Sequence, residues 1–272
     1  MYDLKGKVAF ITGAGSEHGM GRAIANRLAQ EGADVVVNDI SKNPYADYTP
    51  EWGGVHQVAK EVEALGRKGL AILGDITDSA QVDSMVRQAT DTLGHIDILI
   101  NAAALRQGPD LAPVVELDEK VWDQTQAVNV KGTFLCSRAV ARGMISRGQG
   151  GKIVIISSIA GKQGYADHAA YCTSKFALIG FTQSLAQELA KYQINVNAIC
   201  PASVQTDRTD SIADALSPEA RERYLSGRAD RVPIGRVAEG ADIAKTVTFL
   251  CSSESDYLTG LSISVAGGYM MH

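Results

Sequence analysis

A phenol, an ammonium and a hydroxyl group are spaced in this chain so that one site could hold all three. Lys175 follows Tyr171 by four residues, and Ser158 precedes the tyrosine by thirteen. If this segment is helical, Tyr171 and Lys175 lie on one face, with their Cβ atoms about 5 to 6 Å apart. A free tyrosine has a pKa of about 10, and a fixed cation beside it favours the phenolate. The pair therefore has the chemistry of an acid/base catalyst.

The sequence around these residues strengthens this interpretation. A tyrosine with a lysine four residues later arises easily by chance, so the pair alone would carry little weight. Ser158, however, directly follows the strand-like run IVIIS, and Tyr171 begins a long helix-like pattern, YCTSKFALIGFTQSLAQELA. Open α/β sheets place their chemistry at strand ends and helix starts. The context therefore predicts an active site.

Alternating patterns predict a Rossmann-like α/β fold. Helix-period segments, including a long one over about 116–147, separate seven β-branched runs that we interpret as strands. Such alternation favours a doubly wound, mainly parallel sheet with helices on both faces. The seven runs are KVAFIT, ADVVVND, GLAILGD, IDILINA, KIVIIS, INVNAIC and LSISVAG.

Two stretches fall outside this alternation. Residues 41–54 carry prolines, glycines and aromatics, and are expected to form an inserted surface loop. Residues 206–232 are polar, are expected to be partly helical, and follow the sixth predicted strand. Loops beyond the carboxyl ends of strands line the ligand crevice, which makes 206–232 the better candidate for a substrate lid.

Composition and charge are those of an ordinary globular enzyme. The chain of 272 residues is 45% hydrophobic and 21% charged, and no composition break divides 1–272 into separate domains. A net charge of -5 argues against a nucleic-acid partner, and no apolar stretch reaches membrane-spanning length. The N-terminus runs almost at once into a predicted strand, without room for a signal peptide, so we expect a cytoplasmic protein.

The cysteines are expected to be structural thiols. Cys136, Cys172, Cys200 and Cys251 are widely spaced in apolar patterns, where small buried thiols are common. No CxxC pair or Cys/His cluster connects them, so the sequence predicts no metal site.

A glycine-rich turn follows the first predicted strand and precedes a predicted helix. Glycines let the backbone approach a pyrophosphate, and the helix N-terminus offers unpaired N–H donors. The residues predicted to bind the cofactor here are Gly13, Gly15, Gly19, Met20 and Gly21.

The end of the second predicted strand indicates which dinucleotide binds. Asp39 lies twenty-six residues after Gly13, where a carboxylate can accept hydrogen bonds from both adenosine ribose hydroxyls and repel a 2′-phosphate. No Arg or Lys occupies the glycine loop or the two positions after Asp39, and His18 and Lys42 are the only cations near it in sequence. We therefore predict NAD rather than NADP.

Taken together, these residues resemble the short-chain dehydrogenase/reductase family, classical branch, over essentially the whole chain. The resemblance implies an NAD(H)-dependent oxidoreductase that interconverts a small-molecule secondary alcohol and a ketone, assembled as a homotetramer or homodimer. It rests on the glycine loop and on Asp75-Ile76, Asn101-Ala-Ala-Ala, Asn129 in VNVKGTF, Ser158, Tyr171-x-x-x-Lys175 and Pro201-Ala-Ser-Val-Gln-Thr206.

The same resemblance implies a role for each motif. Tyr171 would exchange a proton with the substrate oxygen, and Ser158 would hydrogen-bond to that oxygen. Lys175 would bind the nicotinamide ribose, and Asn129 would anchor a water that relays protons. The remaining implied cofactor contacts are Asp75 and Ile76 at the adenine, Asn101 and Ala102 beside the cofactor and the central sheet, and Val204 and Thr206 at the nicotinamide carboxamide and phosphate.

The glycine loop departs from the family pattern. The family has TGxxxGxG, whereas two additional residues separate Gly13 from Gly19 here. We expect the additional residues to form a bulge facing solvent, with direct phosphate contact from Glu17 or His18 as the alternative.

Basic residues near the expected substrate pocket indicate a polar or anionic substrate, such as a sugar, polyol, sugar acid or hydroxy acid. Arg106, Gln163 and Arg208 are the predicted substrate contacts. Lys162, Arg228 and Arg231 add further positive charge nearby, although each cation could equally be a solvated surface group.

Two other functions share part of this pattern. An NADP-dependent 3-oxoacyl-thioester reductase would carry the same motifs, but Asp39 opposes NADP. A dinucleotide-sensing regulator without catalytic activity would keep the glycine loop yet often lose Tyr171 or Lys175, and both are present.

Overall fold

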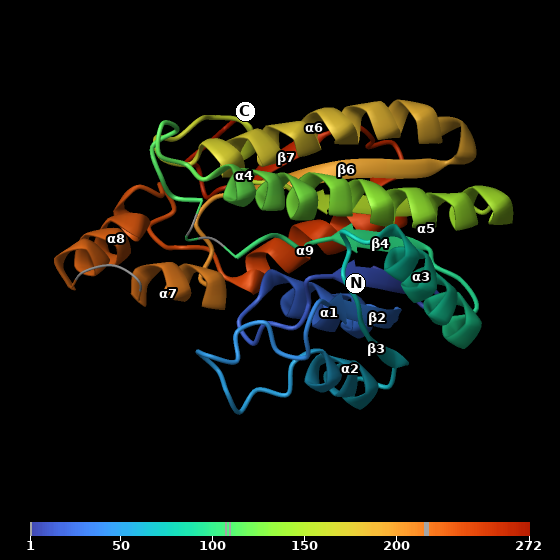
Figure 1. Cartoon of the computed structure of the whole chain (residues 1–272). Coiled ribbons are helices and arrows are strands. Elements are labelled where there is room, and N and C mark those ends of the chain that lie inside the picture. Colours follow the sequence, from blue (N-terminus) through green and yellow to red (C-terminus); the bar gives the residue numbers. More distant parts are fainter. Residues whose placement is uncertain (1, 107, 109, 215–217) are drawn as a thin grey trace.

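The computed structural model describes residues 2–106, 108, 110–214 and 218–272. Within these ranges the chain forms a seven-stranded sheet in the order β3-β2-β1-β4-β5-β6-β7, and every neighbouring pair is parallel (Figure 1). This confirms the predicted Rossmann-like sheet. The strands are β1 (Val8–Thr12), β2 (Asp34–Asp39), β3 (Gly69–Leu73), β4 (Ile98–Asn101), β5 (Gly151–Ile156), β6 (Ile194–Pro201) and β7 (Ser262–Val265).

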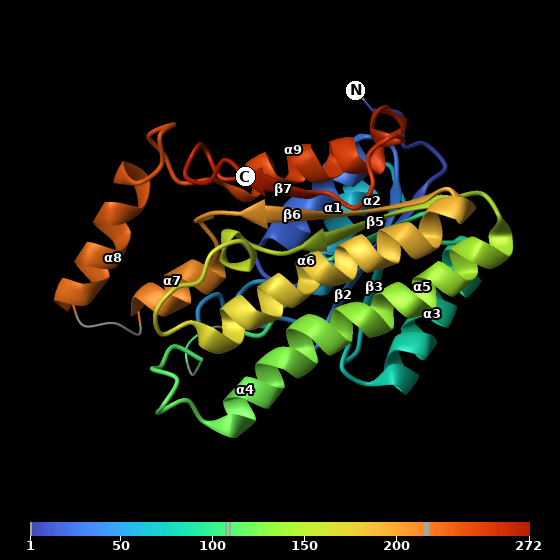
Figure 2. The ribbon, with the colours of Figure 1, turned by 90° about the horizontal axis from the view of Figure 1, so that it is seen from above.

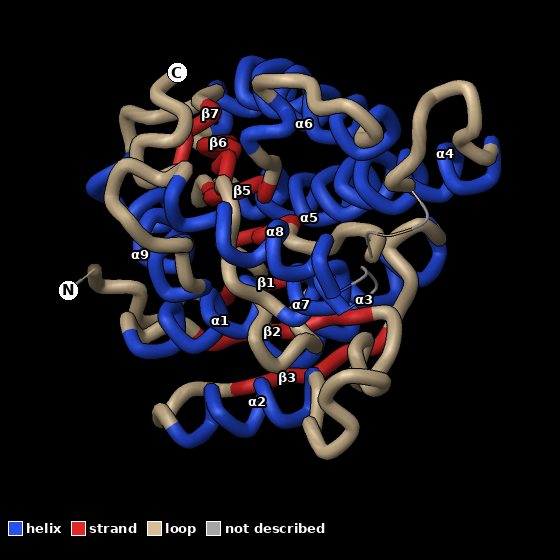
Figure 3. Tube along the Cα trace, turned by 90° about the vertical axis from the view of Figure 1, so that its left-hand side faces the viewer, coloured by secondary structure: helices blue, strands red, loops and turns tan. Residues whose placement is uncertain are grey.

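Helices cover both faces of the sheet, and Figure 3 shows the strands between the two helical layers. One layer contains α1 (Met20–Gln30), α2 (Val55–Ala64) and α9 (Gly240–Cys251). The other contains α3 (Ser79–Leu93), α5 (Thr133–Arg147) and α6 (Ala169–Leu189). None of the helices in the described ranges is both long and apolar enough to cross a membrane.

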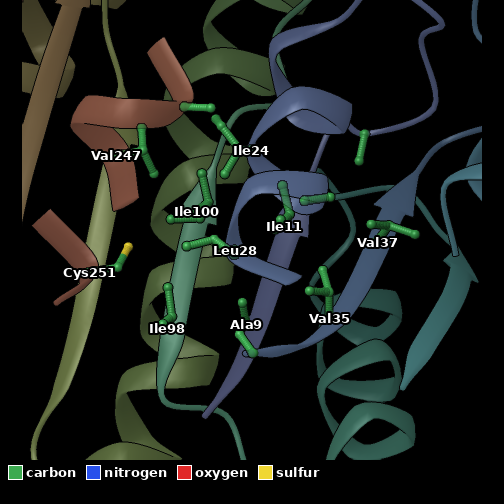
Figure 4. Packing of buried hydrophobic residues seen from close by; sticks show 14 of the residues in the cluster. Ala9, Ile11, Ile24, Leu28, Val35, Val37, Ile98, Ile100, Val247 and Cys251 are labelled. Atoms are coloured by element: carbon green, nitrogen blue, oxygen red, sulfur yellow. The ribbon is translucent and has the colours of Figure 1, made fainter. Parts of the chain in front are cut away.

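Alternation along the strands divides the core in two. Ala9 and Ile11 of β1 pack toward α1 and α9, whereas Val8 and Phe10 pack toward the opposite helices. Figure 4 shows the first cluster, in which Leu28 of α1 lies against the sheet. Because successive side chains of a strand point to opposite faces, a strand covered on both sides is apolar throughout.

The predicted long helix over about 116–147 begins later and is not uniform. Asp118 caps it by accepting a hydrogen bond from the Lys120 N–H at 2.8 Å, and α4 (Glu119–Gln126) follows. A π-helical turn, η1 (Ala127–Gly132), then separates α4 from α5. Asn129 lies in this turn and is buried. Such single π turns recur at functional sites, and hydrophobic periodicity does not reveal them.

The two stretches outside the alternation lie at the carboxyl-end side of the sheet. Residues 41–54 connect β2 to α2 without helix or strand. The predicted lid contains α7 (Asp207–Asp214) and α8 (Pro218–Asp230), which confirms its partly helical character, while positions 215–217 lie outside the described residues. Figure 2 shows both helices beyond the carboxyl end of β6.

Candidate active site

A cavity of about 450 Å³ opens beyond the carboxyl ends of β1 to β4. It lies where the strand order changes direction, between β1 and β4, which is where open α/β sheets bind ligands. Its volume is in the range of small-molecule sites. Ten of the residues predicted for cofactor or substrate line it: Gly13, Gly19, Met20, Asp39, Asp75, Ile76, Ala102, Arg106, Thr206 and Arg208.

The glycine loop fits a bound phosphate. A Cβ on Gly13 would lie 2.6 Å from the Ala103 Cα, and the φ of Gly13 is +69°, so only glycine suits this position. Helix α1 begins at Met20, and its N-cap residue, Gly19, has no side chain that could accept a hydrogen bond from the first helix N–H groups. The first N–H groups of α1 therefore have no side-chain cap and remain available to an oxyanion.

Asp39 is held in place by the backbone. Its Oδ2 accepts a hydrogen bond from the Gly15 N–H and its Oδ1 accepts one from the Ile40 N–H, both at 2.9 Å. Burial raises the pKa of Asp39 above its ordinary value, and the two hydrogen bonds oppose this effect. The carboxylate lines the cavity, as a group that accepts hydrogen bonds from a ribose must.

The 41–54 insertion forms part of the cavity wall, a role that the sequence leaves open. Tyr45 lines the cavity, and the Trp52 indole N–H donates to the Gly15 carbonyl at 2.8 Å. Arg106 lies over the rings of Tyr45 and Tyr48, at 5.1 and 4.9 Å from their centroids. The available signal was the high aromatic content of an otherwise polar loop.

The charge of Arg106 is already paired. Its guanidinium forms an ion pair with Asp47 of the insertion at 2.9 Å. The predicted substrate residue therefore connects the loop after β4 to the insertion. Gln163, another predicted substrate residue, is exposed after the short helix η2 (Ile159–Gly161) and does not line this cavity.

The two additional residues of the glycine loop do more than form a solvent-facing bulge. The His18 side chain is 62% exposed, but the backbone N–H of His18 donates to the Asp207 carboxylate at 2.9 Å. The ring Nδ1 of His18 lies 2.8 Å from the same carboxylate. The Ser16 hydroxyl also donates to Asp207, at 2.6 Å. Burial acts to raise the pKa of Asp207, but these hydrogen bonds outweigh it and hold the pKa below its ordinary value. The glycine loop is thereby tied to the first residue of α7.

Tyr171 and Lys175 occupy one face of α6, as the spacing predicts. The Lys175 Nζ lies 5.6 Å from the centroid of the Tyr171 ring and donates to the Ile156 carbonyl at 2.9 Å. Ser158 follows β5, and its Oγ accepts a hydrogen bond from the Ala160 N–H at 3.1 Å. Helix α6 packs against η2, so the elements that carry the serine, the tyrosine and the lysine meet.

Asn129 links the loop after β4 to helix α6. Its Oδ1 accepts a hydrogen bond from the Leu105 N–H at 2.8 Å, and its Nδ2 donates to the Ser174 Oγ at 2.9 Å. The Ser174 hydroxyl donates in turn to the Tyr171 carbonyl at 2.7 Å. Asn129 is therefore placed to fix the π turn against the first turn of α6.

A buried cation stands beside the tyrosine. Burial, with a smaller contribution from the positive charge of Arg208, lowers the pKa of Lys175 to about 7. Arg208 itself lies over the Tyr171 ring, 5.0 Å from its centroid. Anything that binds here with negative charge would favour the protonated lysine.

Two predicted cofactor residues are engaged within the protein. The Asn101 side-chain amide donates to the Ser137 Oγ at 3.0 Å, while its Oδ1 is buried without a partner among the described residues. The Val204 carbonyl accepts hydrogen bonds from Arg228 and from Thr209, at 3.1 and 3.2 Å. These contacts attach α7 and α8 to the end of β6.

Known proteins resemble this chain over nearly its full length. Residues 13–270 match the protein family described as enoyl-(acyl carrier protein) reductase. A sorbitol dehydrogenase of Cereibacter sphaeroides is 38% identical over 273 residues, covering 98% of this chain and 99% of its own. A 2-dehydro-3-deoxy-D-gluconate 5-dehydrogenase of Escherichia coli is 35% identical, covering 99% and 97%. The solved structure of an NAD⁺-bound xylitol dehydrogenase has a TM-score of 0.86 at 30% identity and covers 97% and 99%.

The buried lysine makes stability depend on pH. Because the pKa of Lys175 falls from its ordinary 10.5 to about 7, the unfolded chain binds more protons between these values, and stability rises with pH there. Between pH 6 and pH 8, the free energy of unfolding of the wild type should gain about 1 to 1.5 kcal/mol relative to Lys175→Met. Urea unfolding at both pH values measures this gain, and the exposed Lys191→Met is the control. Equal pH responses of the wild type and Lys175→Met would contradict the assignment.

Proposed function

Because the chain belongs to the short-chain dehydrogenase/reductase family, we propose that it is an NAD-dependent oxidoreductase that interconverts the secondary alcohol and the ketone of a sugar, polyol or sugar acid. The observation that carries this proposal is the assembly of Tyr171, Lys175, Ser158 and Asn129 next to a glycine-lined cavity. Relatives named for sorbitol, galactitol and a sugar acid support the substrate class.

The proton chemistry falls to the side chains at the start of α6. The Tyr171 hydroxyl exchanges a proton with the substrate oxygen, and the positive charge of Lys175 favours the phenolate that this exchange requires. Ser158 hydrogen-bonds to the same substrate oxygen, and Asn129 holds the tyrosine's helix turn through Ser174. The dinucleotide, when bound, supplies the hydride acceptor or donor.

Most of the proposed cofactor contacts line the cavity, whereas Asn101, Val204 and Lys175 do not. The glycine loop and the N-terminus of α1 would hold the pyrophosphate, and Asp39 the adenosine ribose. Asp75 and Ile76 would contact the adenine. Asn101, Ala102, Val204 and Thr206 would support the nicotinamide half, together with Lys175 at its ribose.

NAD is proposed over NADP because of the charge at the end of β2. Asp39 presents a carboxylate to the cavity, and it would repel a 2′-phosphate. The neighbouring Ile40 and Ser41, which also line the cavity, carry no positive charge to bind such a phosphate. The NAD⁺ bound to a related xylitol dehydrogenase is consistent with this preference.

We also propose a homotetramer or homodimer in the cytoplasm. Phe134 of α5 and Phe176 of α6 are 40% and 47% exposed, and Phe134 contacts Phe181 edge to face. Large apolar side chains gathered on two adjacent helices are typical of subunit interfaces. The cytoplasmic location is supported by the four free, buried cysteines, because reducing compartments keep thiols unpaired.

Removing the Tyr171 hydroxyl tests the mechanism. Tyr171→Phe should lower kcat by about 100- to 10,000-fold, because a positioned general acid or base contributes that much. Protein fluorescence should show that the variant still binds NADH, and Tyr192→Phe, altered at a surface tyrosine of the described chain, is the control. Undiminished turnover by Tyr171→Phe would leave a dinucleotide-sensing role or a different catalytic group.

The charge of Asp39 should set cofactor preference. Asp39→Asn keeps an acceptor for backbone N–H groups but removes the carboxylate. The ratio of kcat/KM with NAD to that with NADP should fall at least about tenfold, since a hydrogen bond to a charged group contributes about 1.5 to 3 kcal/mol. Steady-state kinetics with both cofactors measures the ratio, with the exposed Asp3→Asn as control. A wild type that prefers NADP would contradict the proposal directly.

A charge on the outer face of α6 should disrupt assembly. Phe176→Asp would place a carboxylate in the proposed interface, so the mass from light scattering should fall below that of the wild-type oligomer. Tyr257→Asp, at a fully exposed side chain elsewhere, should leave the mass unchanged. A monomeric wild type, or an unchanged Phe176→Asp mass, would exclude this interface.

A further inference from the structure

Arg208 is a partly buried cation without an ion-pair partner among the described residues. It stands in the first turn of α7 and lines the cavity, with its guanidinium 5.0 Å from the centroid of the Tyr171 ring. Its Nη2 is buried and has no hydrogen-bond partner among the described residues. A buried charged donor that stays unpaired costs free energy, so its burial beside a catalytic residue indicates a partner that arrives with a ligand.

The carboxylates on the same helix are all engaged elsewhere. Asp207 accepts hydrogen bonds from Ser16 and His18. Asp210 accepts one from the Gln205 side-chain amide at 2.5 Å, and Asp214 pairs with Arg221 at 3.2 Å. Because Asp207 is fixed to the glycine loop, the adjacent Arg208 is held toward Tyr171 rather than paired within its own helix.

Three of the other four basic residues expected near the substrate have partners in the described structure, and the fourth, Arg231, is exposed. Arg106 pairs with Asp47, and Arg228 donates to the Ser203 hydroxyl at 2.7 Å. Lys162 donates to the carbonyls of Ser262 and His272, both at 2.6 Å. Arg208 is therefore the basic group of this set that has a buried donor without a partner and also lies over the Tyr171 ring.

We propose that Arg208 binds the carboxylate of the substrate, and that the enzyme prefers hydroxy acids and sugar acids to neutral polyols of the same carbon skeleton. This inference rests on the proposed function and narrows its substrate class. A guanidinium matches a carboxylate with two parallel hydrogen bonds, which an ammonium cannot reproduce. The position beside Tyr171 places the bound carboxylate close to the carbon that reacts.

A carboxylate at Arg208 would also serve the catalytic lysine. The charge of Arg208 contributes to the lowered pKa of Lys175. Neutralising that charge with a substrate anion removes this contribution, so the lysine keeps its proton more readily while the substrate is bound. Charge recognition and acid/base catalysis would then be linked through one arginine.

Matched substrates test the preference. Three pairs share a skeleton and differ only at one terminus: sorbitol and D-gluconate, xylitol and D-xylonate, galactitol and D-galactonate. The wild type should turn over at least one aldonate with a higher kcat/KM than its alditol. Arg208→Met should lower that kcat/KM about 10- to 100-fold through KM, and should lower the alditol value by a clearly smaller factor. Arg208→Lys should recover only part of the loss. The control Arg87→Met, altered at an exposed arginine, should lose no activity.

Binding separates this proposal from the proposed function. Glutarate has two carboxylates and no hydroxyl to oxidise, so its affinity for the NADH complex, measured by calorimetry, reports anion binding alone. Arg208→Met should abolish glutarate binding and leave the NADH dissociation constant, measured by fluorescence, unchanged. If no alditol or aldonate is oxidised while glutarate binding still depends on Arg208, the proposed function fails and the anion site stands.

Other outcomes overturn the assignment. If Arg208→Met raises the NADH dissociation constant tenfold and leaves glutarate binding intact, the arginine serves a cofactor phosphate. If aldonates and alditols lose kcat/KM equally, Arg208 has no role in recognising the carboxylate. If the wild type oxidises alditols better than aldonates in all three pairs, the oxidoreductase function stands and the carboxylate site is wrong.

Discussion

The close approach of the chain segments after β1 and β4 is the constraint on which the site depends. The Thr12 hydroxyl accepts hydrogen bonds from the N–H groups of Ala102 and Ala103, each at 3.2 Å. The two segments lie so close together that position 13 has no room for a side chain, and glycine occupies it. One segment continues into the glycine loop, and the other continues to Leu105, which donates to Asn129. A single contact at the sheet's switch point thus positions both the glycine-rich turn and, through Asn129, the helix that carries Tyr171.

Charge is distributed unevenly over this framework. Asp39 lines the cavity at the end of β2, whereas the buried Lys175 and the partly buried Arg208 stand at Tyr171. Asp207 is the neighbour of Arg208 in the chain, but its carboxylate accepts hydrogen bonds from Ser16 and His18. The site therefore offers an acceptor to ribose hydroxyls at one end and unneutralised positive charge at the other, and a ligand pair with the opposite arrangement would fit it best.

Local patterns in the sequence are sufficient to predict the sheet and the helix that carries Tyr171 and Lys175. β-branched runs located every described strand, and the four-residue spacing placed Tyr171 and Lys175 on one face of α6. The contact of His18 with Asp207 spans 189 residues and has no local signature, so the two additional residues of the glycine loop were expected to face solvent. The π turn at Asn129 was missed for a related reason, because its register depends on packing rather than on the hydrophobic pattern.

The difference between features set by local sequence and features set by tertiary contacts also explains why the reaction is easier to infer than the substrate. The groups proposed to move the proton stand at strand ends and helix starts, where backbone geometry fixes them and motif spacing indicates them. Arg106 and Arg208 are equally basic in the sequence, yet tertiary contacts give them different states: Asp47 neutralises the first, and the second remains unpaired. The number of basic residues thus says little about the substrate's charge. What matters is which of these two arginines lacks an anion in the described structure, and that is Arg208, over the Tyr171 ring.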